Sequence, residues 1–249
     1  MKNTIGASFY IRFLLTSIII IVSGLFFLNN NFGENYYAGD PVIIDSDITL
    51  AKALENITIP DSIKKNLAIV DVNYFSFDNR LHKGQLVIRK ELATDIKAIF
   101  KEIEYSHFPV EKVIPIVKYN WSDDASMEDN NSSAFNYRTI KGSKVMSFHS
   151  KGQAIDINPL INPEIKHGEV SPAGGVYDTT KPGTITINSI VFKAFIKRGW
   201  QWGGQWHSYK DYQHFEKANV NDDNIAAKGN TVIPFKHAVI RAKKLIKKH

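Results

Sequence analysis

Ser147–Asn158 (SFHSKGQAIDIN) and Trp200–Glu216 (WQWGGQWHSYKDYQHFE) are the two most informative segments of the sequence. In the first stretch His149 and Asp156 stand seven residues apart, so an extended chain would separate their Cα atoms by roughly 24 Å. Two ligands of one metal ion must converge to within a few ångströms, which requires the chain to reverse direction. Gly152 and the two residues before it can supply this reversal, because glycine accepts positive φ.

The residues within these two stretches indicate one face toward the core and one face toward a cleft. In the strand predicted after the reversal, Ile155 and Ile157 point to one side and Asp156 to the other. The isoleucines can therefore close the core while the carboxylate faces a cleft. In the second stretch Asp211 and His214 are three residues apart, so they share a face on one helical turn or on a tight turn. This arrangement suits a metal site in which one residue binds the ion and the other moves protons on its water.

Three motifs follow one another in this part of the chain, and a fourth segment precedes them. They are Ser-x-His-x-x-Gly-x-Ala-x-Asp (Ser147, His149, Gly152, Ala154, Asp156), Trp-x-Trp-Gly-Gly-x-Trp (Trp200–Trp206), Asp-x-x-His-Phe (Asp211, His214, Phe215) and the upstream Asn130–Arg138. The three motifs, in this order, resemble the VanY-type D-alanyl-D-alanine carboxypeptidases, which belong to the zinc peptidases grouped with lysostaphin and the hedgehog signalling domain, and the upstream segment resembles one branch of this family. The resemblance spans roughly residues 60–218.

The resemblance implies a role for five residues. It implies that His149, Asp156 and His214 bind Zn²⁺. It makes Asp211 the catalytic acid/base and Arg138 a residue that binds substrate and transition state. Vancomycin-resistance dipeptidases of the same family carry Glu-x-x-His where this chain has Asp211, and a branch of the family with Asp-x-x-His also exists. Asp is one methylene shorter than Glu, so the resemblance does not fix which substrate is cleaved.

The amino-acid composition excludes several kinds of site and of partner. The 249 residues include no cysteine, which excludes disulfides, thiol catalysis and cysteine-based zinc fingers, so any metal must be held by His and carboxylate. The net charge is +6, and six Lys/Arg without any acid lie in the last fourteen residues, 236–249. The remainder carries 25 Lys/Arg against 25 Asp/Glu and is formally neutral. A neutral body with a basic tail does not indicate a nucleic-acid-binding protein.

The N-terminus predicts export. Lys2 and Arg12 precede Phe13–Leu28, sixteen residues without a charge (FLLTSIIIIVSGLFFL), as in a signal anchor or a signal peptide. No clean cleavage motif follows, which favours an anchor in the cytoplasmic membrane with the body outside, in the cell envelope. We therefore expect a signal anchor or signal peptide at 1–28, a juxtamembrane linker at 29–59, a zinc peptidase domain at 60–218 and a basic C-terminal extension at 219–249.

The expected fold is a single α+β domain, in which a small antiparallel sheet carries the zinc site and helices flank it. Apolar and β-branched runs predict strands, and apolar residues at helical spacing predict helices. The expected elements are strands at 67–75, 86–88 and 113–118, a helix at 90–104, a polar loop at 122–133, paired strands at 145–148 and 154–157, and a helix from Asn188 to Gly199.

The tryptophan-rich segment has two interpretations. Trp200–Trp206 could form a cleft wall, or Trp200 and Trp202 could brace the core while Gly203 and Gly204 let the backbone pass close to the metal loop. We favour the brace. His207 is the rival ligand nearest to the motif, and we expect it to face solvent.

The function that the resemblance implies is a zinc peptidase acting on the peptide stem of peptidoglycan. Removal of a terminal D-alanine is the first expectation, and cleavage between L-alanine and D-glutamate is the alternative. Both substrates carry a carboxylate near the scissile bond, so Arg138 does not separate them. A non-catalytic, zinc-containing wall-binding module is a third possibility, but it would be expected to lack a ligand or Asp211.

Overall fold

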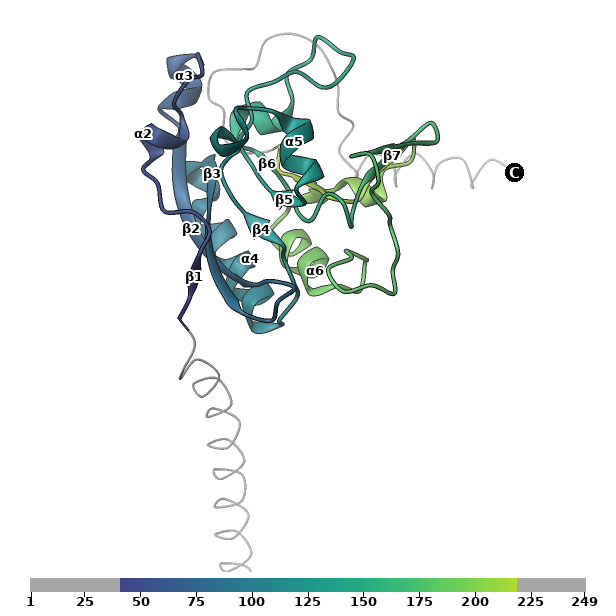
Figure 1. Ribbon diagram of the computed structural model, residues 1–249. Coiled ribbons are helices and arrows are strands. Elements are labelled where there is room, and N and C mark those ends of the chain that lie inside the picture. Colours follow the sequence, from purple (N-terminus) through teal and green to yellow (C-terminus); the bar gives the residue numbers. More distant parts are fainter. Residues whose placement is uncertain (1–40, 219–249) are drawn as a thin grey trace, which may run out of the picture.

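The computed structural model describes residues 41–218, which form several small sheets with helices between them (Figure 1). Each sheet has two or three strands. The strands are β1 Ile43–Ile44, β2 Leu67–Phe75, β3 Leu81–Arg89, β4 Lys112–Val113, β5 Asn131–Ser132, β6 Ala154–Asp156, β7 Glu164–Lys166, β8 Glu169–Ser171, β9 Gln201–Trp202, β10 Lys210–Asp211 and β11 His214–Glu216. The α-helices are α2 Leu50–Ala53, α3 Asp61–Lys64, α4 Ala93–Tyr105, α5 Asp123–Glu128 and α6 Ile190–Ile196, and the 3₁₀ helices are η1 Lys90–Leu92, η2 Ile116–Tyr119, η3 Phe148–Lys151 and η4 Gly203–Gln205.

The longest hairpin, β2–β3, forms one wall of the core. β2 covers the predicted strand 67–75, and its residues pair antiparallel with β3 from Leu67 opposite Arg89 to Phe75 opposite Leu81. Helix α4 follows β3 as predicted and buries Ile96, Ile99 and Ile103 against this hairpin. These residues recur every three or four positions, so one helical face supplies the core.

A second sheet, with strand order β6-β11-β9, carries two of the three predicted metal ligands, Asp156 and His214, whereas His149 lies in η3. Both of its pairings are antiparallel. Ile155 of β6 and Phe215 of β11 are cross-strand partners and lie fully buried in the same core cluster. The α+β fold with a small antiparallel sheet at the site is therefore confirmed.

Two predicted elements upstream of the site were wrong. The strand expected at 113–118 ends at Val113, and Pro115 precedes the 3₁₀ helix η2 instead of interrupting a strand. The polar loop expected at 122–133 contains α5, which begins where the Ser122 hydroxyl accepts a hydrogen bond from the Ala125 N–H. A serine cap followed by two acidic residues favours a helix start, and the buried Met127 holds this short helix on the body.

The predicted pairing of 145–148 with 154–157 was also wrong. Residues 148–151 form η3, and β6 pairs with β11, which lies far away in the sequence. The segment before η3 folds into its own hairpin, in which Thr139 and Met146 form an isolated bridge. The later helix α6 has its cap one residue after the expected start Asn188, because the Ser189 hydroxyl accepts from the Phe192 N–H, and the helix itself begins at Ile190.

Part of the segment expected as a linker packs on the domain. β1 pairs in parallel with β3, and Ala53 and Leu54 lie buried in a small cluster with Leu67. We therefore propose that the packed unit begins near Ile43 rather than at residue 60. The predicted membrane segment 1–28 and the basic extension 219–249 lie outside the described residues. Within 41–218, no helix is both long enough and apolar enough to span a bilayer.

Candidate metal centre

His149 is positioned by a short 3₁₀ turn between two fixed points. The Ser147 hydroxyl accepts from the His149 N–H at 3.3 Å and so caps the start of η3. Gly152 ends the turn in the left-handed region with φ 65°, as the sequence predicted. A Cβ at Gly152 would lie 2.7 Å from the Arg89 nitrogen, and the Arg89 N–H donates to the Gly152 carbonyl at 2.9 Å. Only glycine fits this contact, which fixes the turn to β3.

Asp156 and His214 meet because they are cross-strand partners. β6 and β11 run antiparallel, with Asp156 directly opposite His214 and Ile155 opposite Phe215. Side chains of opposite residues lie about 5 Å apart and point to the same face of a sheet. The alternation that buries Ile155 and Phe215 in the core therefore puts the carboxylate and the imidazole together on the other face.

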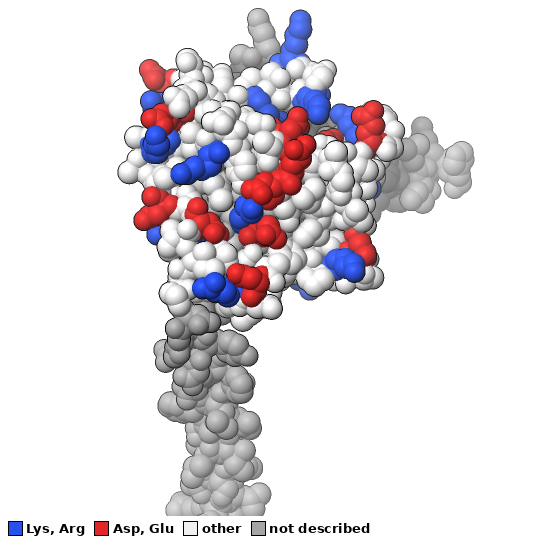
Figure 2. All heavy atoms as spheres, viewed as in Figure 1, with Lys and Arg blue, Asp and Glu red and all other residues white. Residues whose placement is uncertain are grey.

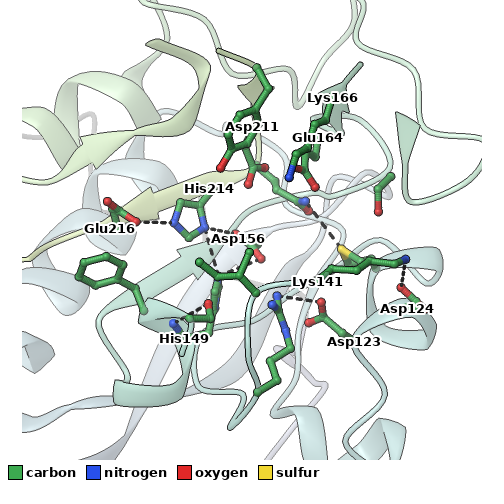
Figure 3. A pocket seen from close by; sticks show the side chains of 18 of the residues that line it. Asp123, Asp124, Lys141, His149, Asp156, Glu164, Lys166, Asp211, His214 and Glu216 are labelled. Carbon is green, nitrogen blue, oxygen red and sulfur yellow. Dashed lines mark hydrogen bonds and ion pairs between the residues drawn. The ribbon is translucent and has the colours of Figure 1, made fainter. Parts of the chain in front are cut away.

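The potential ligand atoms of His149, Asp156 and His214 converge in this structure (Figure 3). Their three contacts are His149 Nε2 to Asp156 Oδ2 at 3.2 Å, His214 Nδ1 to Asp156 Oδ1 at 3.0 Å and His149 Nε2 to His214 Nδ1 at 3.2 Å. All three side chains are at most 9% exposed. Neighbouring ligands of one tetrahedral zinc ion, each about 2.0 Å from the metal, are separated by roughly 3.3 Å. The donor set therefore has the spacing of a tetrahedral site.

The outer hydrogen bonds of the two imidazoles turn their lone pairs inward. His149 Nδ1 lies 2.5 Å from the Ala134 carbonyl, which can only accept, so this nitrogen carries the proton and Nε2 is free to bind. His149 Nε2 and the Asp156 carboxylate are consequently two acceptors facing each other in a buried space. His214 Nε2 faces the Glu216 carboxylate at 3.1 Å, which leaves Nδ1 toward Asp156. A cation held between these acceptors resolves their repulsion, so the residues present fit a metal ion.

The same contacts set the pKa values of this group in the metal-free protein. Burial alone would lower the pKa of His214, but hydrogen bonds to Asp156 and Glu216 outweigh burial and raise it well above the usual value. Burial would raise the pKa of Asp156, but the two histidines outweigh it and hold this pKa well below the usual range. The site is therefore built around a carboxylate that stays ionised and needs positive charge beside it.

Asp211 stands beside the ligand group on the neighbouring strand β10. Strand β10 pairs with β7, where Glu164 is directly opposite Asp211. A Cβ at Gly203 would lie 2.5 Å from the Asp211 carbonyl oxygen, so the predicted close passage of the backbone at this glycine is present. Burial raises the pKa of Asp211 to about 7, and the negative charges of Asp156 and Glu164 act in the same direction. A carboxyl group with such a pKa can both take and give a proton near neutral pH.

Arg138 reaches the same site from the segment that precedes η3. Its Nη2 donates to the Asp123 carboxylate at 2.8 Å, and its Nε is buried without a hydrogen-bond partner. Asp123 belongs to α5, which also carries Asp124 and Glu128. In the view of Figure 2, acidic side chains form an oblique band across the middle of the molecule, in the region where Figure 1 shows α5.

All five residues singled out in the sequence, Arg138, His149, Asp156, Asp211 and His214, line one cavity of about 130 Å³. Trp206 forms part of its wall, with its ring centroid 5.4 Å from that of His214. Trp200 and Trp202 are buried in the core, which agrees with the predicted brace. His207 is exposed and does not line the cavity, as expected.

Sequence reasoning missed three residues around these five. Glu216 stands two positions after His214, and the period of two along a strand could have placed it on the same face. Gln213 is buried in the cavity wall, but nothing in the sequence distinguished it from the other residues between Asp211 and His214. Asp123 was not identified because helix α5, which carries it, was not predicted.

One family model matches the part of the chain that contains most of the site. Residues 141–217 match the family model described as D-alanyl-D-alanine carboxypeptidase. The matched segment contains the three candidate ligands and Asp211, whereas Arg138 lies just before it. No curated protein and no solved structure was found to match the chain. The match over residues 141–217 confirms the resemblance that the sequence predicted.

Proposed function

We propose that this protein is a zinc-dependent peptidase that removes the terminal D-alanine from the peptide stem of peptidoglycan. The observation that carries the proposal is the buried His149–Asp156–His214 group with its lone pairs turned inward, inside the segment that matches the carboxypeptidase family. In this proposal the three residues hold one Zn²⁺. Two neutral imidazoles and one carboxylate leave a net charge of +1 and a fourth position for water or substrate, as in catalytic zinc sites.

Asp211 is the proposed acid/base. When bound, the zinc ion supplies a Lewis acid and lowers the pKa of water at the site. Asp211 accepts a proton from the attacking water and returns it to the nitrogen that leaves. The water oxygen bonds to the carbonyl carbon, and the electron pair of the broken C–N bond stays on the departing amine. A positioned carboxylate with a pKa near 7 suits both proton transfers.

Arg138 is the proposed binder of substrate charge. Its ion pair with Asp123 fixes the guanidinium at the cavity, and its buried Nε–H has no partner among the described residues. A fixed donor of this kind can bind a carbonyl or carboxylate oxygen of the peptide and stabilise the charge that develops on it. The stem-peptide substrates of carboxypeptidases and of L-alanyl-D-glutamate endopeptidases both carry a carboxylate near the scissile bond, so Arg138 suits either one.

The proposed place of action is the cell envelope, outside the cytoplasmic membrane. The uncharged run Phe13–Leu28 after Lys2 and Arg12 supports export and a membrane anchor. In this proposal the partners are peptidoglycan stem peptides and the membrane, and nucleic acid has no part. Residues 219–249 remain a proposed basic extension beyond the domain.

Digestion of purified muropeptides tests the function. The protein is incubated with pentapeptide stems, with and without a zinc chelator, and the products are identified by mass. Loss of one alanine residue from the C-terminus, abolished by chelator and restored by zinc, is the expected result. Release of a fragment that begins at D-glutamate would replace the carboxypeptidase by the endopeptidase. No product with fully zinc-loaded protein would favour the wall-binding module.

A further inference from the structure

Gln213 is a buried side chain of the cavity wall that the proposed mechanism does not yet use. It lies in the turn between β10 and β11, and the residue is 4% exposed. The Ile157 N–H donates to its carbonyl at 3.1 Å, so its backbone is fixed to the end of β6. The chain therefore holds this amide beside the metal ligands and Asp211.

The orientation of the amide follows from the neighbour of its nitrogen. Nε2 of Gln213 lies 3.7 Å from the Met127 sulfur. A thioether can only accept a hydrogen bond, so the NH₂ end of the amide belongs on this side. The oxygen Oε1 is then the free end, and it is buried without a hydrogen-bond partner. Buried acceptors are rarely left unpaired in a native protein, so Oε1 calls for a donor that comes from outside the chain.

The other unpaired atoms lie in the same place. Among residues 41–218, three buried side-chain atoms lack a partner: Arg138 Nε, Asp211 Oδ1 and Gln213 Oε1. All three residues line the cavity of the candidate metal centre. The set consists of one donor and two acceptors, and a peptide bond presents the complementary groups, a carbonyl oxygen and an N–H.

We propose that Gln213 is a substrate-binding residue whose Oε1 accepts the N–H of the scissile amide. This inference rests on the proposed peptidase function. Arg138 supplies the donor for a substrate oxygen, and Asp211 is assigned to proton transfer, so Gln213 is the acceptor that remains for the N–H. The NH₂ end of its amide also donates to the Asp211 carboxylate, which lowers the pKa of Asp211 and keeps the two side chains next to each other. The same nitrogen would therefore face Gln213 through its existing hydrogen and Asp211 through the lone pair that receives the new proton.

Gln213 transfers nothing in this scheme. It holds the N–H while the nitrogen changes from a planar amide to an amine, which keeps the developing lone pair toward Asp211. Its contribution is that of one neutral hydrogen bond, and its loss is expected to lower kcat/KM by roughly 2- to 13-fold.

The test compares an amide with an ester in the wild type and in Gln213→Met. Methionine has a similar length and cannot accept the N–H in the same way. The two substrates are a stem peptide ending in D-alanine and its depsipeptide ending in D-lactate, which has an oxygen in place of the scissile N–H. We expect Gln213→Met to lose roughly 2- to 13-fold in kcat/KM on the amide and several-fold less on the ester. Its zinc content and melting temperature are measured in the same preparations.

The matched control is Gln153→Met. Gln153 is also a buried glutamine, but its Nε2 donates to the Lys217 carbonyl at 3.3 Å and it does not line the cavity. The control is expected to change the amide-to-ester ratio in neither direction.

Each result decides between the proposals. Equal losses of Gln213→Met on both substrates, no loss on the amide, or loss of zinc from this variant would each overturn the role of Gln213 and leave the peptidase in place. A zinc-loaded wild type that cleaves neither substrate would overturn the peptidase function, and the role of Gln213 with it.

Discussion

Removal of the Glu216 carboxylate is expected to weaken zinc binding without touching a ligand. Glu216 accepts from His214 Nε2 at 3.1 Å, and this contact leaves His214 Nδ1 turned toward Asp156 at 3.0 Å. In Glu216→Ala the imidazole can carry its proton on either nitrogen and is free to rotate. Loss of such an outer partner costs 10- to 100-fold in metal affinity, or about 1.4–2.8 kcal/mol. The Glu216 side chain is 16% exposed, so water can replace part of the lost contact, and we expect a loss near tenfold.

The assay is competition for zinc with a chromophoric chelator at fixed pH, with the wild type, Glu216→Ala and Glu216→Gln. Glutamine keeps an oxygen that can accept the same proton, so Glu216→Gln should retain most of the affinity. Melting temperatures of the metal-free proteins separate a loss of fold from a loss of binding. An unchanged dissociation constant in Glu216→Ala, or equal losses in both variants, would refute the orienting role of Glu216.

The remaining predictions concern the acid/base, a close glycine and acid stability. Asp211→Asn should retain zinc and lose roughly 10²- to 10⁴-fold in turnover, whereas Asp156→Asn should lose zinc and activity together; metal analysis and turnover on the same samples check this. Gly203→Ala should lower stability by about 1–3 kcal/mol and reduce activity, because its Cβ would lie 2.5 Å from the Asp211 carbonyl oxygen; denaturant unfolding measures the loss. Burial would raise the pKa of Glu102, but hydrogen bonds and charges from Lys197 and Arg198 outweigh burial and hold this pKa below 4.5. Glu102 therefore stabilises the fold above pH 4.5, and this contribution is lost as the pH falls through the lowered pKa, so melting temperatures of Glu102→Gln should depend less on pH in that range.

The long elements and the ligand pattern were predictable from the sequence because local signals agree with the final packing there. β2 combines β-branched residues over 67–75, and α4 repeats apolar residues at helical spacing, so each element defines its own buried face. Gly152 indicated the reversal of the chain between His149 and Asp156. The alternation of side chains along a strand indicated that the isoleucines and the Asp156 carboxylate lie on opposite faces.

The partners of the short strands could not be predicted, because strands of two or three residues carry little local information. The pairing of Asp156 with His214 joins residues fifty-eight positions apart and depends on the whole fold. Helix α5 was overlooked because its single buried methionine gives no periodicity, so the contact of Arg138 with Asp123 was overlooked as well. The roles of Glu216 and Gln213 could not be predicted, because they depend on the atoms that these side chains contact in the folded cavity.

Zinc content per chain is the measurement that tests the metal centre most directly. The wild type, His149→Ala and His214→Ala are purified in parallel, and bound metal is quantified after removal of loosely held ions. We predict about one zinc per chain in the wild type and almost none in either variant, because each imidazole supplies one of three protein ligands. Full zinc occupancy in both variants, or a folded wild type that binds no zinc, would contradict the assignment of His149, Asp156 and His214 as the ligands.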